Sequence, residues 1–302
     1  MAQTGEEPPR PADAGDAWRA HHRVLLDVAY RLLGSVAEAE DAVAEAFARL
    51  AREPIAEIDD VRGWLVVVVS RICLDQLGSA RARREAYVGQ WLPEPVLTGA
   101  DGTPAGDPAD RVTLDDSIRM ALLVVLERMA PAERVVFVLH DVFGYAFEEV
   151  AQIVGRSPAS CRQLASRGRR RVREEPATRF SVDPEREEAV ARRFLAASAG
   201  GDATELMRLL DPDVVLRADG GGKIIAPRRP VTGPEPVLRI IAHAFRQYPD
   251  AAVEFTRVNG GPGMAVRGTG GRLLAVAAFV IADDRVQAID LHGNPDRLAT
   301  LS

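Results

Sequence analysis

The chain has 302 residues, a formal net charge of −6 and 47% hydrophobic residues, which suits two or three domains with ordinary cores. Cys73 and Cys161 stand far apart, so the spacing indicates neither a metal module nor a disulfide framework. No segment approaches the roughly 18 apolar residues of a membrane span, and residues 1–17 lack the apolar run of a signal peptide. We therefore expect a soluble cytoplasmic protein with a disordered leader at residues 1–17.

Residues 18–86 are predicted to be helical. Apolar residues at three- and four-residue spacing give the segment Glu38–Leu50 one core-facing side and leave an acidic side opposite. A second helix is predicted from about Asp60 to Arg84. Its Val66–Val69 run favours a strand locally, but the helical period continues on both sides and no turn residue interrupts it.

Prolines alternate with glycines in residues 87–110, which indicates a linker. The linker contains the apolar, stiff segment Trp91–Pro95, which is unlike a passive spacer. A further helical domain is predicted over residues 111–175, followed by a second break around Pro176–Pro184.

The segment Phe147–Ser166 has the pattern of a helix-turn-helix. Ala151 is small where two helices must approach closely, and Gly155 supplies a left-handed turn. Ser157 is placed to cap the second helix, with Pro158 at its first position. Residues 156–173 hold seven arginines and no acid, a pattern typical of DNA binding. The alternative is an ordinary helical hairpin with a solvated basic face.

Residues 185–302 change character. Helices are predicted over Glu185–Ala199, Ala203–Leu210 and Pro234–Tyr248. Five strand-like segments separated by Gly or Asp turns are Val214–Arg217, Ala252–Val258, Met264–Gly268, Arg272–Ile281 and Arg285–Leu291. Helices combined with a mostly antiparallel sheet predict an α+β domain.

The helical blocks resemble a known family. Tyr30–Phe47, Arg62–Leu65 and Ser70–Leu77 are similar to region 2 of extracytoplasmic-function sigma factors, and Ala130–Tyr145 with the helix-turn-helix is similar to their region 4. The resemblance covers about residues 18–175 and implies a promoter-recognition subunit of RNA polymerase. The implied partners are core RNA polymerase, through its β′ clamp helices and β subunit, and promoter DNA. We expect no cofactor, no metal and no membrane partner.

The resemblance implies roles for three groups of side chains. The surface that binds core polymerase is the acidic face of Glu38, Asp41 and Glu45, for which a solvated helix face is the alternative. The readers of the −10 element are Arg71, Asp75, Gln76, Arg81, Arg83 and Arg84. The −35 element is contacted by Ser157, Ala159, Ser160, Arg162, Gln163, Ser166, Arg167 and Arg170, the last two on phosphates. Trp64 is either a core residue or a platform on which a base stacks.

Three further segments resemble marks of a subgroup whose members carry a C-terminal SnoaL-like domain of the NTF2-like cone fold. They are the linker residues Trp91, Leu92, Pro93, Glu94 and Pro95, the turn residues Asp219, Gly220, Gly221, Gly222 and Lys223, and the tail residues Asn294, Pro295, Asp296, Arg297 and Leu298. The resemblance implies that this domain regulates the sigma factor in cis. We expect turn and tail to dock near the linker, with Lys223, the one lysine of the chain, opposite Glu94. Arg297 departs from the subgroup pattern, in which lysine is expected.

The predicted fold is multidomain, with two all-α sigma domains followed by an α+β NTF2-like cone. The predicted boundaries are 18–86 for region 2, 87–110 for the linker, 111–175 for region 4 and 185–302 for the SnoaL-like domain. Two readings of the last domain stay open beside cis regulation. SnoaL-like domains can be enzymes, and Asp290 and His292 fall on one strand face, where an acid–base pair or two solvent-facing groups would both fit. The domain can also sense a small-molecule ligand without turnover. A dimeric repressor would leave the region-2 block unexplained.

Overall fold

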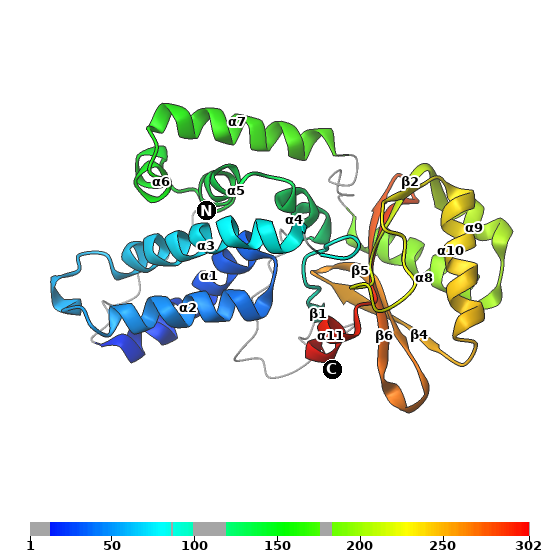
Figure 1. Ribbon diagram of the computed structural model, residues 1–302. Helices are drawn as coiled ribbons and strands as arrows, with labels where there is room; N and C mark the ends of the chain where they lie inside the picture. Colours follow the sequence, from blue (N-terminus) through cyan, green and yellow to red (C-terminus); the bar gives the residue numbers. More distant parts are fainter. Residues whose placement is uncertain (1–12, 86, 99–118, 176–182, 302) are drawn as a thin grey trace. The chain divides into compact units, whose positions relative to one another are not determined.

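The computed structural model describes residues 13–85, 87–98, 119–175 and 183–301, which contacts divide into two compact units (Figure 1). The helical unit contains, of these, residues 13–81 and 129–168. The C-terminal unit contains residues 82–98 except 86, together with 119–128, 169–175 and 183–301. Within the described residues, no helix has the length and apolar character needed to cross a membrane.

The first part of the helical unit is built from α1 (Ala14–Leu33), α2 (Val36–Leu50), a 3₁₀ turn (η1, Ile55–Glu57) and α3 (Val61–Glu85). Gly34 ends α1 with a φ of 71°, and the Ser35 side chain caps α2 by accepting from the Glu38 amide at 3.4 Å. The helical reading of the Val66–Val69 run is confirmed, because the run lies inside α3.

The second part of the helical unit contains α5 (Pro131–Phe137), a π-helical turn (η2, Val138–Val142), α6 (Phe147–Val154) and α7 (Pro158–Glu174). Gly155 adopts the left-handed conformation at φ 64° between α6 and α7, so the predicted turn is confirmed. The buried Arg134 of α5 donates to the Leu32 carbonyl of α1 at 2.8 Å. This hydrogen bond ties α5 to α1 inside one compact unit.

The C-terminal unit contains a seven-stranded sheet in the order β1-β4-β5-β6-β7-β2-β3. Its strands are β1 (Leu97–Thr98), β2 (Leu210–Asp219), β3 (Val231–Thr232), β4 (Ala252–Val258), β5 (Gly261–Arg267), β6 (Leu273–Ala282) and β7 (Arg285–His292). Its helices are α4 (Met120–Glu127), α8 (Pro184–Gly200), α9 (Ala203–Leu209), α10 (Pro234–Gln247) and α11 (Pro295–Leu298), with 3₁₀ turns η4 (Thr269–Gly271) and η5 (Ala299–Leu301). The sheet is mixed, because β2 pairs with β7 in parallel while the other neighbours are antiparallel.

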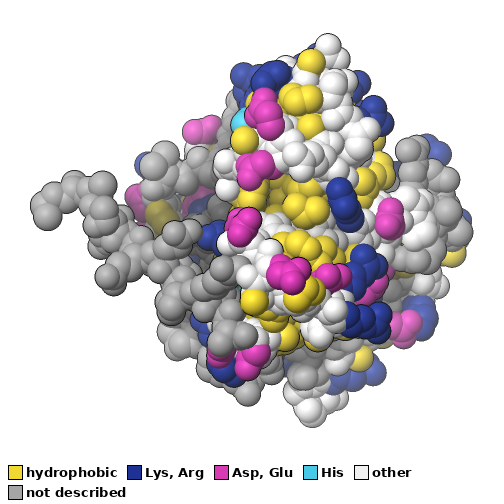
Figure 2. Space-filling view, turned by 90° about the vertical axis from the view of Figure 1, so that its left-hand side faces the viewer, with side chains coloured by type: hydrophobic (Ala, Val, Ile, Leu, Met, Phe, Trp, Pro, Cys, Tyr) yellow, Lys and Arg dark blue, Asp and Glu magenta, His cyan; other side chains and the backbone are white. Residues whose placement is uncertain are grey.

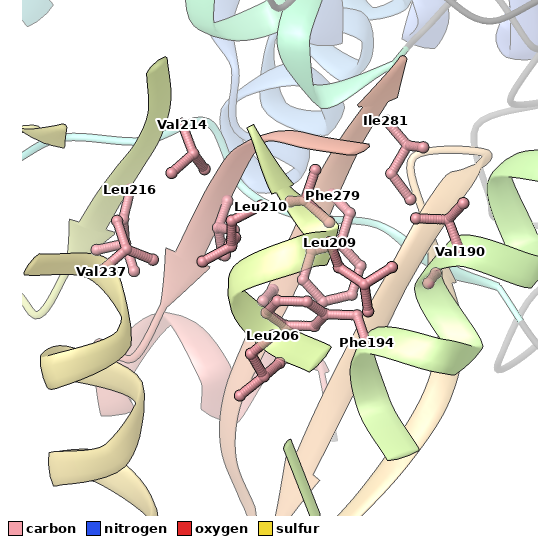
Figure 3. Packing of buried hydrophobic residues seen from close by; sticks show 14 of the residues in the cluster. Val190, Phe194, Leu206, Leu209, Leu210, Val214, Leu216, Val237, Phe279 and Ile281 are labelled. Atoms are coloured by element: carbon pink, nitrogen blue, oxygen red, sulfur yellow. The ribbon is translucent and has the colours of Figure 1, made fainter. Parts of the chain in front are cut away.

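One face of the sheet is covered by α8, α9 and α10 (Figure 1). Figure 3 shows Phe194 of α8 and Leu206 of α9 pointing toward the sheet strands. The ring centroids of Phe194 and Phe279 are 5.3 Å apart at an interplanar angle of 64°, a tilted pairing that aromatic rings favour. This is the core expected of the α+β domain.

The other face of the sheet is covered by the linker, α4 and the tail. Side chains of β6 alternate between the faces, so that Phe279 joins the helix-covered core and Val276 joins a second core. The second core contains Leu92, Leu97, Met120, Val124, Val258, Ala265, Leu273, Val276, Ala278 and Leu298. The strand β6 is therefore buried on both sides, as its unbroken apolar sequence requires. Residues 92–97 of the predicted linker are part of this domain.

Candidate nucleic-acid interface and linker-docking site

The second helix of the helix-turn-helix, α7, separates a buried side from an exposed side. Ser157 caps its start, since the Ser157 Oγ accepts from the Ser160 amide at 3.2 Å. Cys161, Leu164 and Ala165 are buried. Of the predicted −35 contacts, Ser160 is half-buried, and Ser157, Ala159, Arg162, Gln163, Ser166, Arg167 and Arg170 are exposed. The predicted −35 contacts thus lie on the side of the helix opposite Cys161, Leu164 and Ala165.

Arg162 is held loosely at the surface. Its Nη2 donates to the Glu148 carboxylate of α6 at 3.0 Å, and its guanidinium lies 5.4 Å from the centre of the Phe147 ring. The two charged side chains are 56% and 64% exposed, so the pair contributes only about 0–1 kcal/mol. Arg162 can therefore exchange Glu148 for another acceptor at little cost.

The predicted polymerase surface lies on α2. Asp41 and Glu45 are exposed and Glu38 is half-buried, while Val43 and Phe47 are buried on the opposite side. Glu45 also pairs with Arg49 one turn later, an exposed contact of little energetic weight. On the face shown in Figure 2, acidic and basic side chains of the described residues are interspersed with hydrophobic ones.

The predicted −10 readers on α3 are only partly described. Arg71 and Asp75 are exposed and Gln76 is half-buried, as is Trp64. The Arg71 Nη2 donates to the Gln152 carbonyl of α6 at 3.0 Å, which leaves the other N–H donors of this exposed guanidinium available. The side chains of Arg81, Arg83 and Arg84 lie outside the described part of the structure.

Arg297 joins the tail, the turn and the linker. Its Nη1 donates to the Leu92 carbonyl and to the Asp219 Oδ2, each at 2.6 Å. The same guanidinium lies 4.5 Å from the centre of the Trp91 ring, a cation–π distance. Asp219 is 1% exposed, so this charged hydrogen bond is sheltered from water.

Tyr87 adds a second connection between the linker and the same carboxylate. Its hydroxyl donates to the Asp219 Oδ1 at 2.5 Å and accepts from the Asn294 Nδ2 at 2.8 Å. Burial, and then the hydrogen bond to Asp219, raise the pKa of Tyr87 to about 12. The phenol is therefore a stable donor at neutral pH. Sequence reasoning missed Tyr87, which lies four residues before the predicted contact segment.

The glycines of the turn permit these close approaches. Gly221 and Gly222 have φ values of 60° and 71°, a region that residues with a Cβ adopt rarely. A Cβ on Gly221 would clash with the Asn294 amide, and one on Gly222 would lie 3.0 Å from the Val88 Cβ. A side chain at Gly221 would push the turn away from the tail, and one at Gly222 would push it away from the linker.

The expected pairing of Lys223 with Glu94 is wrong. Lys223 forms an ion pair with Asp296 of the tail, while the Glu94 Oε1 lies 3.4 Å from the Thr300 hydroxyl that donates to it. Glu94 of the linker is 8% exposed, whereas the Lys223 side chain is half exposed at the end of the turn. The turn meets the linker at Tyr87 and Val88 instead, where its glycines leave room.

The described part of the linker, residues 87–98, includes a short sheet strand. Leu97 of β1 pairs with Val258 of β4 in antiparallel register. Asn259 extends the pairing, because its amide donates to the Val96 carbonyl at 2.8 Å and its Oδ1 accepts from the Val96 amide at 3.2 Å. The linker therefore adds backbone hydrogen bonds to its apolar contacts with this domain.

A cavity of about 150 Å³ lies on the helix-covered face of the sheet. Asp290 and His292 are not among the residues that line it. Asp290 is fully buried and accepts from Arg217 Nε at 2.5 Å. Burial, and to a smaller extent the charge of Arg297, lower the pKa of His292 to about 3. Ile289 and Leu291 line the cavity, so the alternating side chains of Asp290 and His292 lie on the opposite face of β7. The pair is therefore not placed for acid–base chemistry in the cavity.

Comparison with known proteins assigns a family to this architecture. Residues 17–83 match the model of Sigma-70 region 2, residues 119–172 match Sigma-70 region 4, and residues 191–289 match the SnoaL-like domain. The ECF RNA polymerase sigma factor SigJ of Mycobacterium tuberculosis is 43% identical over 292 residues, which cover 93% of this chain and 91% of SigJ. The chain belongs to the extracytoplasmic-function (ECF) RNA polymerase sigma factors.

Two further similarities support the same assignment for this ECF sigma factor. The probable ECF RNA polymerase sigma factor SigI of M. tuberculosis is 45% identical over 230 residues, covering 75% of this chain and 77% of SigI. The crystal structure of M. tuberculosis SigJ superposes with a TM-score of 0.76 at 38% identity, covering 94% of this chain and 98% of that one. Promoter-specific transcription initiation is accordingly the function of the region-2 and region-4 blocks, and the predicted fold class is confirmed.

Region 4 of this ECF sigma factor is divided between the two compact units. The matched region begins at residue 119, yet α4, its first helix, contributes Met120 and Val124 to the core beneath the linker. The remaining helices of region 4, up to Gly168, belong to the helical unit. The C-terminal unit thus holds both the linker and the first helix of region 4.

Proposed function

We propose that this sigma factor recognises promoters through α3 and α7, binds core RNA polymerase through the acidic face of α2, and is controlled in cis by the docking of its linker on the C-terminal unit. The protein would act in the cytoplasm. The observation that carries the regulatory part is the set of contacts made by Arg297 to Leu92, Trp91 and Asp219.

Docking can control the sigma factor because of where the linker is held. The linker follows the region-2 helix α3 and precedes region 4. Its Leu92 and Leu97 share one core with Met120 and Val124 of α4. Docking therefore fixes the connection between the −10 reader and the start of the −35-reading domain. Because the contacts are intramolecular, an effective concentration of about millimolar makes even modest contacts sufficient.

The regulatory part is tested with Arg297→Ala and Trp91→Ala in transcription reconstituted with core polymerase and a promoter. Arg285→Ala is the matched control, since Arg285 is exposed on β7 of the same unit. We expect both linker variants to change promoter-specific output by at least about fivefold, a typical coupling strength, with unchanged affinity for core polymerase. Output equal to that of Arg285→Ala would refute cis control.

The polymerase contact is tested by reversing the charge of Asp41 and Glu45 to arginine. Both side chains are exposed, so the fold should be retained, with a change in stability within about 0.5 kcal/mol each. We expect the double variant to fail in a core-polymerase pull-down while its circular dichroism spectrum is unchanged. The same substitutions at Glu53 and Glu57, exposed residues after the end of α2, serve as a control. Normal assembly of the Asp41/Glu45 variant would exclude this surface.

A further inference from the structure

The turn between β4 and β5 consists of Asn259 and Gly260, across which Val258 pairs with Gly261. Asn259 and Gly260 have φ values of 52° and 70°, and a two-residue hairpin turn with positive φ at both positions favours the sequence Asn-Gly. The same step is chemically labile. Asparagine is one of the thermolabile residues, and glycine has no side chain that would shield its own amide nitrogen from the neighbouring carboxamide.

The reaction open to this Asn-Gly step is deamidation, for which the chain itself supplies the nucleophile. The Gly260 nitrogen loses its proton to hydroxide and attacks the Asn259 Cγ, which closes a cyclic succinimide. The bond between Cγ and Nδ2 breaks, and the nitrogen takes a proton from water and leaves as ammonia. Water then opens the succinimide at either carbonyl, which gives aspartate or isoaspartate and adds one negative charge at position 259.

The docked linker holds the carboxamide that this reaction would consume. The Asn259 Oδ1 accepts from the Val96 amide at 3.2 Å, and the Asn259 backbone amide donates to the Val96 carbonyl at 2.8 Å. Asn259 is 0% exposed, and the preceding Val258 shares a core with Leu92 of the linker. The hydrogen bond to Val96 restricts the rotation that ring closure requires. Hydroxide and water reach the carboxamide only when this region opens locally.

We propose that Asn259 is a deamidation site which the docked linker protects, and that deamidation of a chain with a released linker keeps the linker from docking again. The proposal rests on linker docking being the regulatory contact. Redocking would enclose the new carboxylate, and a charge costs far more to bury than a neutral amide. Isoaspartate also lengthens the backbone of the turn, which disturbs the pairing of Val258 with Gly261. A transient release thereby becomes a lasting one.

The site is tested by incubating the full chain at mildly alkaline pH and following deamidation by peptide mass spectrometry. The chain has two asparagines, and Asn294 is an internal control because the Pro295 that follows it has no N–H to attack with. Val96→Pro removes the N–H from which the Asn259 Oδ1 accepts. We expect it to speed deamidation about fivefold, the factor for one hydrogen bond of typical strength. Val96→Ala keeps this N–H and is the matched control.

Two results would overturn the site. One is the absence of any mass gain at Asn259 in Val96→Pro. The other is an equal rate of deamidation in Val96→Pro and Val96→Ala, since the hydrogen bond to the carboxamide would then protect nothing.

Protection by the linker is tested with Arg297→Ala in the same assay. If the reaction proceeds from the released state, the rate of deamidation and the hydrogen exchange of the Val96 amide should rise by the same factor. Arg285→Ala should change neither rate. Faster exchange at Val96 without faster deamidation would overturn protection by the linker, and so would the absence of any change in Arg297→Ala.

The lasting release is tested on the deamidated chain, which its extra negative charge allows anion exchange to separate from the intact chain. We expect residues 87–97 to exchange hydrogen at least about fivefold faster in the deamidated chain. Asn259→Asp, which adds the charge without lengthening the backbone, should show a smaller increase. Exchange equal to that of the intact chain in both would overturn the lasting effect. These measurements contain no polymerase and no promoter, so their failure is distinct from a failure of Arg297→Ala to change transcription, which would refute cis control itself.

Discussion

Arginines have opposite environments in helix α7 and in the C-terminal unit. In α7, Arg162 is 56% exposed and pairs with Glu148, which is 64% exposed. In the C-terminal unit, the Arg217 side chain is 3% exposed and that of Arg297 is 17% exposed, and each binds one carboxylate that is at most 1% exposed. Arg217 also pairs with Glu175, which is 19% exposed. Exposed pairs are weak and exchangeable, whereas a buried carboxylate depends on its partner.

The exposed arginines of α7 can therefore exchange one acceptor for another, whereas the buried pairs of the C-terminal unit stabilise its structure. Substitution of an exposed arginine should reduce DNA binding and leave stability unchanged. Substitution of a buried arginine should reduce stability or release the linker.

The largest effect is expected at Arg217. Arg217→Ala leaves the fully buried Asp290 without its nearest cation, and losing one partner of a buried pair costs about 3–5 kcal/mol. Urea unfolding followed by circular dichroism measures the loss. The double variant Arg217→Met/Asp290→Leu removes both charges and should recover most of the stability. A loss below about 1 kcal/mol in the single variant would place Arg217 with the exchangeable arginines.

An intermediate effect is expected at His292, a buried group that is kept neutral rather than charged. Its pKa in the folded chain is about 3, below the 6.5 of an unfolded chain. As pH falls below 6.5 the unfolded state binds a proton that the folded state cannot bind, so stability is lost down to about pH 3. Between pH 7 and pH 5 the intact chain should lose about 2 kcal/mol more than His292→Leu. Identical pH profiles in urea unfolding would contradict this environment.

Smaller effects are expected on α7, and they should fall on DNA affinity. Arg162→Ala should cost about 1–3 kcal/mol of discrimination between a native and a substituted −35 element. Arg170→Ala should weaken binding to all sequences alike and reduce the log–log salt slope by about one. Footprinting of the holoenzyme at several salt concentrations separates the two. Full −35 discrimination by Arg162→Ala would remove it from the reading surface.

The smallest effect is expected when these two variants are unfolded. Because Arg162 and Arg170 are exposed, each substitution should change the free energy of unfolding by less than about 0.5 kcal/mol. A larger loss would mean that the Glu148 pair contributes to the stability of the helix-turn-helix.

Local signals were enough to predict most of the secondary structure. The helix-turn-helix follows from Gly155, Ser157 and Pro158, whose preferred conformations are set by neighbouring residues alone. The five predicted strands correspond to β2, β4, β5, β6 and β7, because Gly and Asp turns separate them. The parallel pairing of β2 with β7 was not predicted, since it depends on a crossover rather than on a turn.

Contacts between distant segments were harder to predict. Tyr87 and Asp219 are 132 residues apart, and no periodicity relates them. The sequence grouped the turn and the tail together but did not indicate which of their side chains meet. In the structure, Lys223 of the turn pairs with Asp296 of the tail. One signal was present and unused: β6 is apolar on both faces, so a second layer had to cover it. The linker supplies much of that layer.

Control of transcription by the docked linker is tested most directly with a reversible covalent lock. Leu97 and Val258 are cross-strand partners, so Leu97→Cys/Val258→Cys can hold the linker on the sheet when Arg297→Ala has weakened its docking. Transcription from one promoter is measured with the triple variant reduced and oxidised, and with each cysteine alone as a control. We predict that the reduced variant shows the altered output of Arg297→Ala and that oxidation restores the output of the intact protein. An altered output that persists after oxidation would contradict control by linker docking.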